Sequence, residues 1–379
     1  MKISNTQHLC YCLNIFRPFK SPAELDILFK KIKALKKELS QPDSESFAIG
    51  IWVNKNFLAF LEEQKNLNTL KEKMEQEKIY TYSFNVFPFE QFHDASIKEK
   101  VYFPDWMENA RVDFTCRAAR LLSRLIPDEV QGSLSTVPGT YTDKISKHNL
   151  SVIQKNFLKT GQFLASLFQD TGKKILLAVE PEPDCLWSSA RDFTDFYSTH
   201  LAEFPNKAEY IGICYDTAHH ELAEDGPGKQ FDYCIINNVN IAKIQFSSAL
   251  GSPENSSKDE LAKFADEVYL HQTKIFKNNK IIAKFADLPH ALAKADRNLH
   301  WKIHYHIPLY VNKMPHGLIA EKHELETVLK KCKEKPEICS NLEIETYTYD
   351  ILPNNVKISP IEKSMAEEYS FIINKICKQ

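Results

Sequence analysis

The sequence predicts an α/β barrel of eight parallel strands with an inserted segment between the seventh and eighth strands. Short apolar runs alternate with longer segments of helical periodicity, as in βαβ units built around a parallel sheet. Four runs lead directly into side chains that can hold a cation or a proton: residues 175–180, 211–217, 241–246 and 342–346. Because the carboxyl ends of barrel strands meet at the face that carries active sites, these four ends predict one polar pocket.

Length, charge and cysteine content narrow the class of protein. The 379 residues, 43% of them hydrophobic, suit a barrel with insertions. The 48 basic and 50 acidic residues nearly cancel, so no charge field indicates a nucleic acid or an anionic membrane as partner. We find no apolar stretch that could span a bilayer and no signal-peptide pattern, and the nine cysteines fit reduced thiols. We therefore expect a cytoplasmic protein.

The strands and helices follow from local pattern, taken in chain order. Apolar and aromatic runs of strand length predict strands at residues 8–15, 47–53, 80–88, 131–138, 174–181, 210–217, 241–247 and 342–346. Apolar residues spaced three and four apart predict helices at about residues 21–35, 54–78, 108–126, 148–171, 191–203, 228–237 and 359–377.

One further strand-like run, WKIHYHIPLY at residues 301–310, is one too many for a bare barrel. Either it belongs to an inserted hairpin over the mouth, or an earlier strand lies outside the barrel, and the sequence leaves both open. The predicted insertion covers approximately residues 250–340. Because no flexible linker or internal repeat divides the chain, we expect residues 1–379 to form a single domain.

Oxygen donors stand at the ends of the late strands. Glu180, Asp216 and Glu345 offer carboxylates, and Gln245 offers an amide carbonyl oxygen. Such ligands suit Mg²⁺ or Mn²⁺, and a nearby imidazole extends the range to Zn²⁺, Fe²⁺ or Co²⁺. We therefore predict a divalent metal as cofactor, with its identity open.

Imidazoles are available near these carboxylates. His219 follows Asp216 by three residues, and His304 and His306 alternate along one strand, so both can face one cavity. Hydrogen-bonded structural histidines would give the same pattern. We take His219 and His306 as further candidate metal ligands and His304 as a candidate substrate contact.

Two carboxylates that flank a bound polyol can act as general acid and base when burial or mutual repulsion raises a pKa. Two of the strand-end carboxylates could form such a pair. Polar residues at other strand ends and loops are candidate substrate-binding residues: Asn85, His93, Ser135, Glu182 and His304.

A series of motifs in order along nearly the whole chain carries a family resemblance: HLCYCLNI, YTYSFNVFPF, VYFPDW, GSLSTVP, LAVEPEPDCLW, CYDTAHH, AKIQFSSAL, HYHIPLY and LEIETYTYDILP. Together they resemble the EboE family of metabolite traffic proteins. That family belongs to the xylose isomerase-like TIM-barrel superfamily, so the resemblance implies a TIM (β/α)8 barrel.

The resemblance also implies a ligand set. Superfamily members, which include sugar isomerases, epimerases and abasic-site endonucleases, hold a divalent metal with Glu, Asp, His and Glu on late strands. By position these roles fall on Glu180, Asp216, Gln245 and Glu345, with the first and last also forming the acid/base pair. The chain departs from the pattern at Gln245, where the epimerases have histidine, which puts metal affinity in question.

The Ebo gene set resembles a biosynthetic cassette for secondary metabolites. The resemblance therefore implies a sugar, sugar phosphate or cyclitol as substrate and other Ebo pathway proteins as partners. We expect a metal-assisted isomerase or epimerase. A metal-dependent phosphoesterase and a non-catalytic metabolite-binding barrel are the alternatives.

Overall fold

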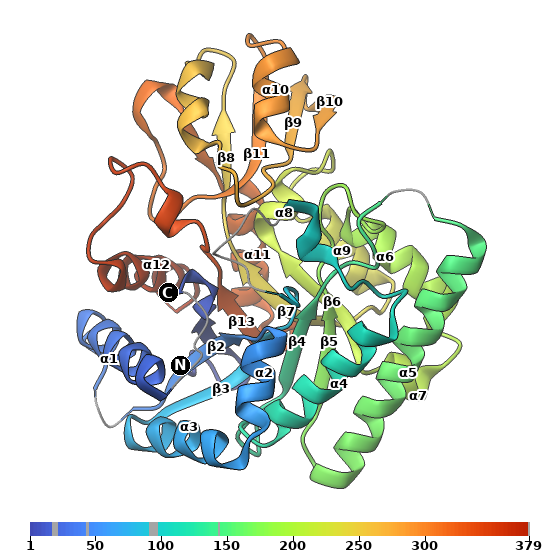
Figure 1. The fold of residues 1–379 in the computed structure, drawn as a ribbon. Helices are drawn as coiled ribbons and strands as arrows, with labels where there is room; N and C mark the ends of the chain where they lie inside the picture. Colours follow the sequence, from blue (N-terminus) through green and yellow to red (C-terminus); the bar gives the residue numbers. More distant parts are fainter. Residues whose placement is uncertain (17–21, 43–44, 91–97, 143–144, 378–379) are drawn as a thin grey trace.

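The computed structural model describes the chain apart from residues 17–21, 43–44, 91–97, 143–144 and 378–379. Eight parallel strands form one sheet in the order β1-β13-β7-β6-β5-β4-β3-β2. A single parallel bridge between Cys12 and Gly50 joins its two ends, so the barrel is nearly closed (Figure 1). The barrel strands are β1 (His8–Tyr11), β2 (Phe47–Trp52), β3 (Ile79–Asn85), β4 (Gly132–Thr136), β5 (Ile175–Val179), β6 (Ile211–Asp216), β7 (Ile241–Phe246) and β13 (Asn341–Ile344).

Helices cover the outside of the barrel, which confirms the predicted fold class (Figure 1). Every residue of β5 is buried, as expected for a strand that packs against helices outside and side chains inside. The surrounding helices are α1 (Pro22–Glu38), α2 (Lys55–Glu62), α3 (Gln64–Gln76), α4 (Asn109–Ser123), α5 (Lys147–Thr171), α6 (Ala190–Phe196), α7 (Pro205–Ala208), α8 (Thr217–Glu221), α9 (Lys229–Ile236), α11 (His323–Glu334) and α12 (Ile361–Ile376).

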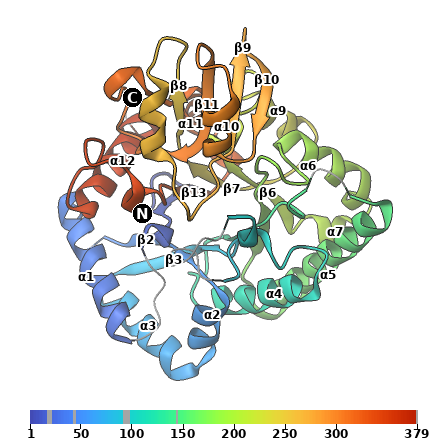
Figure 2. The ribbon, with the colours of Figure 1, turned by 45° about the horizontal axis from the view of Figure 1, so that its top comes forward.

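The inserted segment forms a second, antiparallel sheet of five strands in the order β10-β9-β11-β8-β12. It stands at one end of the barrel, above β6, β7 and β13 (Figures 1 and 2). The extra strand-like run therefore belongs to the insertion, as β11, and no early strand is displaced from the barrel. The elements of the insertion are β8 (Ala249–Ser252), β9 (Thr273–Lys277), β10 (Lys280–Phe285), α10 (Leu288–Lys294), β11 (His300–His306) and β12 (Ile319–Glu321).

Three sequence boundaries need correction. The insertion's sheet ends with β12, and α11, which the approximate bounds 250–340 had included, packs on α8 and α12 as a barrel helix. The helix expected to about residue 78 is two helices, because Glu63 adopts an extended conformation between α2 and α3. The helix expected to residue 203 ends its regular part with α6 and continues as a π-helical turn.

The barrel interior holds a buried ion pair that the sequence analysis missed. Lys243 Nζ lies 2.5 Å from Glu343 Oε1, and both side chains are almost fully excluded from solvent. Lys243 also donates to Ser135 Oγ at 3.2 Å, and the Cys10 thiol donates to Glu343 Oε2. Because a buried charge requires a partner, these groups fix one another beneath the mouth of the barrel.

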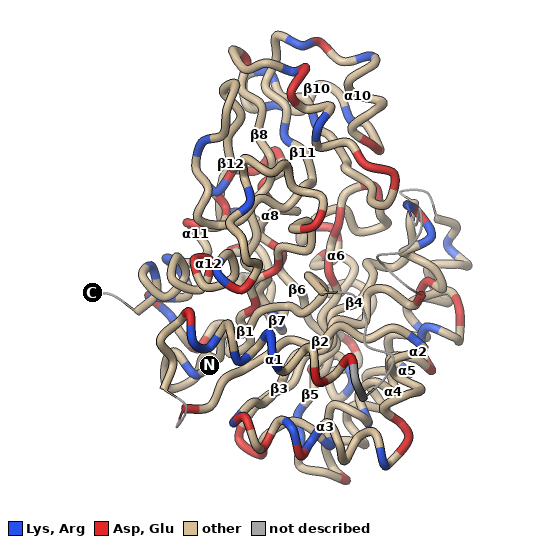
Figure 3. The backbone as a smooth tube through the Cα atoms, turned by 60° about the vertical axis from the view of Figure 1, so that its left-hand side comes forward, with Lys and Arg blue, Asp and Glu red and all other residues tan. Residues whose placement is uncertain are grey.

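The outer surface carries both signs of charge. In the view of Figure 3, basic and acidic residues are interspersed along the chain. Within the described residues, no helix combines the length and the apolar character that a membrane crossing requires.

Candidate functional site

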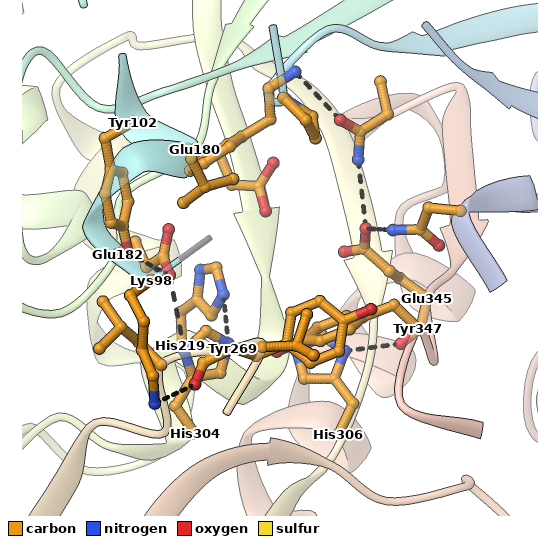
Figure 4. Close-up of a pocket in the computed structure, with 17 residues that line it drawn as sticks. Lys98, Tyr102, Glu180, Glu182, His219, Tyr269, His304, His306, Glu345 and Tyr347 are labelled. Carbon is orange, nitrogen blue, oxygen red and sulfur yellow. Dashed lines mark hydrogen bonds and ion pairs between the residues drawn. The ribbon is translucent and has the colours of Figure 1, made fainter. Parts of the chain in front are cut away.

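A pocket of about 610 Å³, including its mouth, lies where the carboxyl ends of the barrel strands meet the insertion. The barrel contributes Glu180, Glu182 and Glu345, while β11 contributes His304 and His306 (Figure 4). The complete lining is Asn14, Asn85, Phe87, Pro88, Lys98, Val101, Tyr102, Glu180, Glu182, His219, Val268, Tyr269, Leu270, His304, His306, Glu345 and Tyr347.

Glu180 and Glu345 each follow the last residue of a barrel strand, β5 and β13, and both face the pocket (Figure 4). Glu345 Oε1 accepts from the side-chain amides of Asn14 at 2.7 Å and Asn85 at 3.2 Å. Glu180 Oε2 is buried and has no hydrogen-bond partner among the described residues. The Glu345 carboxylate is therefore fixed in place, whereas an oxygen of Glu180 remains available.

Burial raises the pKa of both glutamates well above the usual value. For Glu180 the negative charges of Glu345 and Asp216 add to the effect, and for Glu345 the charge of Asp216 does so. A carboxyl group with a raised pKa can hold a proton near neutral pH and release it again.

Asp216 ends β6 and caps α8, because its Oδ1 accepts the backbone N–H groups of Ala218 and His219. Ser247 Oγ donates to the same oxygen at 2.5 Å. Burial alone would raise the pKa of Asp216, but His219, His306 and these hydrogen bonds outweigh it and place the pKa below its usual value. Asp216 Oδ2 has no hydrogen bond in the described structure and lies 4.0 Å from His306 Nε2.

His219, His304 and His306 lie beside one another in the pocket (Figure 4). The His219 and His304 rings meet edge to face with centroids 4.5 Å apart, and their Nε2 atoms are 3.0 Å apart. His306 lies 5.4 Å from His304 between ring centroids. Burial lowers the pKa of His306 to about 4 and that of His304 well below the ordinary value, which favours the neutral form of both rings.

The part of the lining next to His304 is polar and aromatic. Tyr102 OH donates to Glu182 Oε1 at 2.8 Å, and the Tyr102 ring stacks on Tyr141. Burial raises the pKa of Glu182. Lys98 is the only lysine or arginine in the described lining, and its Nζ is already engaged by Asp287 Oδ2 at 2.6 Å and by two backbone carbonyls. No lysine or arginine of the described lining is therefore left for a phosphate group.

Comparison with solved structures identifies the fold. A xylose isomerase-like TIM barrel protein from Mycobacterium smegmatis, solved in complex with magnesium, is 9% identical over 99% of this chain and 98% of that chain, with a TM-score of 0.57. A xylose isomerase domain protein from Alicyclobacillus acidocaldarius is 12% identical over 98% of this chain and 100% of that chain, with a TM-score of 0.50. A xylose isomerase domain containing protein from Salmonella typhimurium is 13% identical over the full length of both chains, with a TM-score of 0.50.

The chain has the xylose isomerase-like TIM-barrel fold. At these identities the likeness defines the fold alone, because one fold hosts many chemistries. No protein-family model matches the chain, and no curated protein matches it significantly.

The xylose isomerase-like barrel brings most of the candidate residues together. Asn85 and Glu182 line the pocket beside Glu180, Glu345 and the three histidines. Asp216 is not part of the lining, but its carboxylate lies within 4.8 Å of ligand atoms of Glu180, His219, His306 and Glu345. His93 lies outside the described residues.

Two candidates lie beneath the pocket instead of lining it. Gln245 pairs with Asp216 across β6 and β7, but its Oε1, the expected ligand atom, accepts from the Cys214 thiol at 2.9 Å. Ser135 accepts from Lys243 in the barrel interior. Both belong to the layer of side chains under the site.

The sequence analysis missed Gln272, which holds His304, and the aromatic residues Tyr269 and Tyr347 of the lining. Tyr347 follows Glu345 by two residues, and this spacing was a usable signal. Gln272 and Tyr269 offered none, because they come from the insertion's irregular segment before β9.

The residues of the site fit a divalent cation. Glu180 Oε2, Asp216 Oδ2 and His306 Nε2 are buried electron-pair donors without a hydrogen-bond partner among the described residues. Glu180, Asp216 and His219 form one group close enough to share an ion, and Asp216, His306 and Glu345 form another. Buried donors of this kind are costly unless a cation or a hydrogen satisfies them.

Proposed function

We propose that the chain is a metal-assisted isomerase or epimerase that acts on a small polyol metabolite. The observation that supports this most directly is the placement of Glu180 and Glu345 in one pocket, both with raised pKa and both beside metal-capable side chains. Isomerisation and epimerisation both move a proton at the carbon next to a carbonyl group, and this needs an acid and a base around one substrate.

The two glutamates suit different parts of this chemistry. Glu180, with a free carboxylate oxygen, is placed to remove the proton from carbon. Glu345, fixed by Asn14 and Asn85, is placed to deliver or receive the second proton. A divalent cation held by Asp216 and the histidines would polarise the substrate's carbonyl and stabilise negative charge on its oxygens. Both glutamate side chains are themselves buried, although the pocket opens at its mouth.

A neutral polyol is the favoured substrate class. The lining is rich in carboxylates, and its one lysine is already paired with Asp287. A phosphate group would therefore meet carboxyl groups without a free lysine or arginine as partner. The aromatic rings of Tyr102, Tyr269 and Tyr347 can pack on the C–H faces of a sugar or cyclitol. The solved relative from Mycobacterium smegmatis was crystallised with magnesium, which supports a metal-using barrel.

The proposal includes a secondary-metabolite pathway with other Ebo proteins as partners, and the resemblance of the sequence to the EboE family is what supports this part of it. It makes free sugars and cyclitol ketones the first substrates to try, with their phosphate esters as comparisons.

The test is deuterium uptake from D₂O into a panel of sugars and cyclitol ketones, followed by NMR. We expect uptake at the carbon next to the carbonyl group, and we expect Glu180→Gln to lower its rate about 100-fold or more. Glu367→Gln, an exposed residue on α12, is the matched control and should leave the rate unchanged. Ligand binding without deuterium uptake would favour the non-catalytic barrel, and phosphate release from the esters would favour the phosphoesterase.

A further inference from the structure

The arrangement of the three pocket histidines carries an inference about the metal itself. His219 comes from α8 and His304 and His306 from β11, so the barrel and the insertion each supply part of one cluster. All three side chains are at most 5% exposed. One ring nitrogen from each lies within 4.8 Å of the other two.

Two of the imidazoles have their Nδ1 atom committed as a donor. His219 Nδ1 lies 2.9 Å from the backbone oxygen of Pro181, and His306 Nδ1 lies 2.9 Å from that of Glu345. Because a carbonyl oxygen can only accept, each Nδ1 must carry the hydrogen. In the neutral ring the Nε2 atom then carries no hydrogen and has a free lone pair.

The third imidazole is held in the same way by a side chain. His304 Nδ1 lies 2.8 Å from Gln272 Oε1. The orientation of the Gln272 side-chain amide follows from its NH₂ group, because Gln272 Nε2 donates to the Pro183 carbonyl at 3.4 Å and to Tyr102 OH at 3.2 Å. His304 Nδ1 therefore also carries the hydrogen, and in the neutral ring Nε2 has a free lone pair.

In their neutral forms, the three rings therefore direct three lone pairs into the pocket. The Nε2 atoms of His219 and His304 are only 3.0 Å apart, and His306 Nε2 has no hydrogen-bond partner among the described residues. Two lone pairs at this separation repel unless a metal cation or a shared proton lies between them. Nitrogen ligands that are each about 2.1 Å from one ion are separated by about 3.0–3.4 Å, which matches the observed pair.

We propose that His219, His304 and His306 form a three-imidazole site for a borderline divalent cation such as Zn²⁺, Co²⁺ or Fe²⁺. Imidazole favours these ions, whereas Mg²⁺ favours oxygen ligands. Each Nδ1–H···O bond is the outer contact that orients a metal-binding histidine. Asp216, 4.0 Å from His306 Nε2, is the adjacent carboxylate that can complete the set.

The proposed site differs from the ligand set expected from the barrel strands. Gln245 is engaged with Cys214 below the pocket, and two ligands come from the insertion instead. Glu180 and Glu345 then remain free for proton transfer. This use of the metal rests on the proposed function, but its binding by the three histidines can be measured without any substrate.

The experiment is calorimetric titration of the chelator-treated full-length protein with Zn²⁺, Co²⁺ and Mg²⁺, together with the visible spectrum of the Co²⁺ form. We expect about one equivalent of Zn²⁺ or Co²⁺, with Mg²⁺ binding at least ~100-fold more weakly. Loss of an orienting partner costs about 10–100-fold in metal affinity, so His304→Ala and His306→Ala should each cost at least ~100-fold. His290→Ala, an exposed histidine on α10 of the same insertion, is the matched control.

Two outcomes would overturn the proposal. One is tight Zn²⁺ binding that survives His304→Ala and His306→Ala but is lost in Asp216→Asn and Glu345→Gln, which would move the metal to the barrel carboxylates. The other is a protein that binds none of the three ions and whose nitrogen NMR spectrum shows one proton shared by His219 and His304. Zn²⁺ binding by the histidines without deuterium uptake would refute the proposed reaction and leave this site standing.

Discussion

Each pocket histidine has two different environments, one on either ring nitrogen. Nδ1 meets a fixed oxygen, and Nε2 points into the pocket. The oxygen atoms that accept from Nδ1 belong to Pro181, Gln272 and Glu345. They decide that Nε2 is the nitrogen without a hydrogen in each neutral ring. A residue that never touches the metal can in this way control its affinity.

Gln272 gives a direct test at this scale. Gln272→Leu keeps the volume of the side chain but removes the acceptor from His304 Nδ1. We expect Zn²⁺ affinity to fall about 10–100-fold while the stoichiometry stays the same. Calorimetry measures both, with Gln162→Leu on the exposed face of α5 as control. An unchanged affinity would show that Gln272 does not orient His304.

At the scale of elements, strand ends and helix starts place the carboxylates. Asp216 ends β6 and caps α8, and the same short turn carries His219 into the pocket. Beneath them the barrel strands approach closely around the Lys243–Glu343 pair. Gly50 on β2 lies against this pair, where a side chain would overlap Glu343 Oε2 and touch Cys10 Sγ.

Gly50→Ala should therefore lower the free energy of unfolding by about 1–3 kcal/mol, because the buried ion pair must shift to admit one methyl group. Gly226→Ala, where the added carbon meets only the Lys229 side chain at 3.9 Å, should change stability by less than about 0.5 kcal/mol. Urea unfolding of both variants measures the difference. Equal free energies of unfolding for the two variants would mean that the barrel interior around Gly50 can accept a methyl group without moving the Lys243–Glu343 pair.

α11 provides a pH-dependent prediction. Burial raises the pKa of Glu324 to about 7, although Tyr215 OH and the Gly228 N–H donate to its carboxylate. Between about pH 4.5 and 7 the unfolded chain has lost this proton while the folded chain keeps it. The contribution of Glu324 to the free energy of unfolding is therefore fully present below pH 4.5. It is lost as the pH rises to 7, and this loss amounts to at most about 3 kcal/mol.

Glu324→Gln cannot titrate, so the unfolding free energy of the wild type relative to this variant should fall between pH 4.5 and 7. Denaturant unfolding across that range measures the change. Glu334→Gln, exposed on the same helix, should show no such trend relative to the wild type. If the difference in unfolding free energy between the wild type and Glu324→Gln does not change with pH, the pKa of Glu324 in the folded protein is near its ordinary value.

At the scale of the whole molecule, the proposed metal ligands join two sheets. His219 belongs to the barrel, whereas His304 and His306 belong to the insertion. A cation bound by all three would connect the two parts and stabilise only the state in which they are assembled.

Zn²⁺ at about 100 times its dissociation constant should therefore stabilise the folded chain by about 2.7 kcal/mol and raise the thermal midpoint. The shift should disappear in His304→Ala and persist in His290→Ala. Calorimetric scans with Zn²⁺ and with chelator measure it. A shift that is equal in His304→Ala would show that the stabilising ion binds elsewhere.

Much of the barrel follows from local pattern. Strand-length apolar runs such as β5 and β6 are recognisable because burial on both faces demands continuous apolar residues. The carboxylates Glu180, Asp216 and Glu345 were found for a related reason, because each ends such a run. The insertion could be bounded only approximately, since α11 has the same amphipathic pattern whether it covers the barrel or the inserted sheet.

The sequence by itself thus determined the fold class, the strand ends and the acid/base candidates, because periodicity and strand-end position are local properties of the chain. Only the tertiary structure decided that β11 belongs to a second sheet, that Gln245 faces Cys214, and that Lys243 pairs with Glu343. It alone also decided which nitrogen of each histidine faces the pocket. These outcomes depend on contacts between residues far apart in the chain. The local sequence around one residue does not reveal which distant residue will be its hydrogen-bond partner.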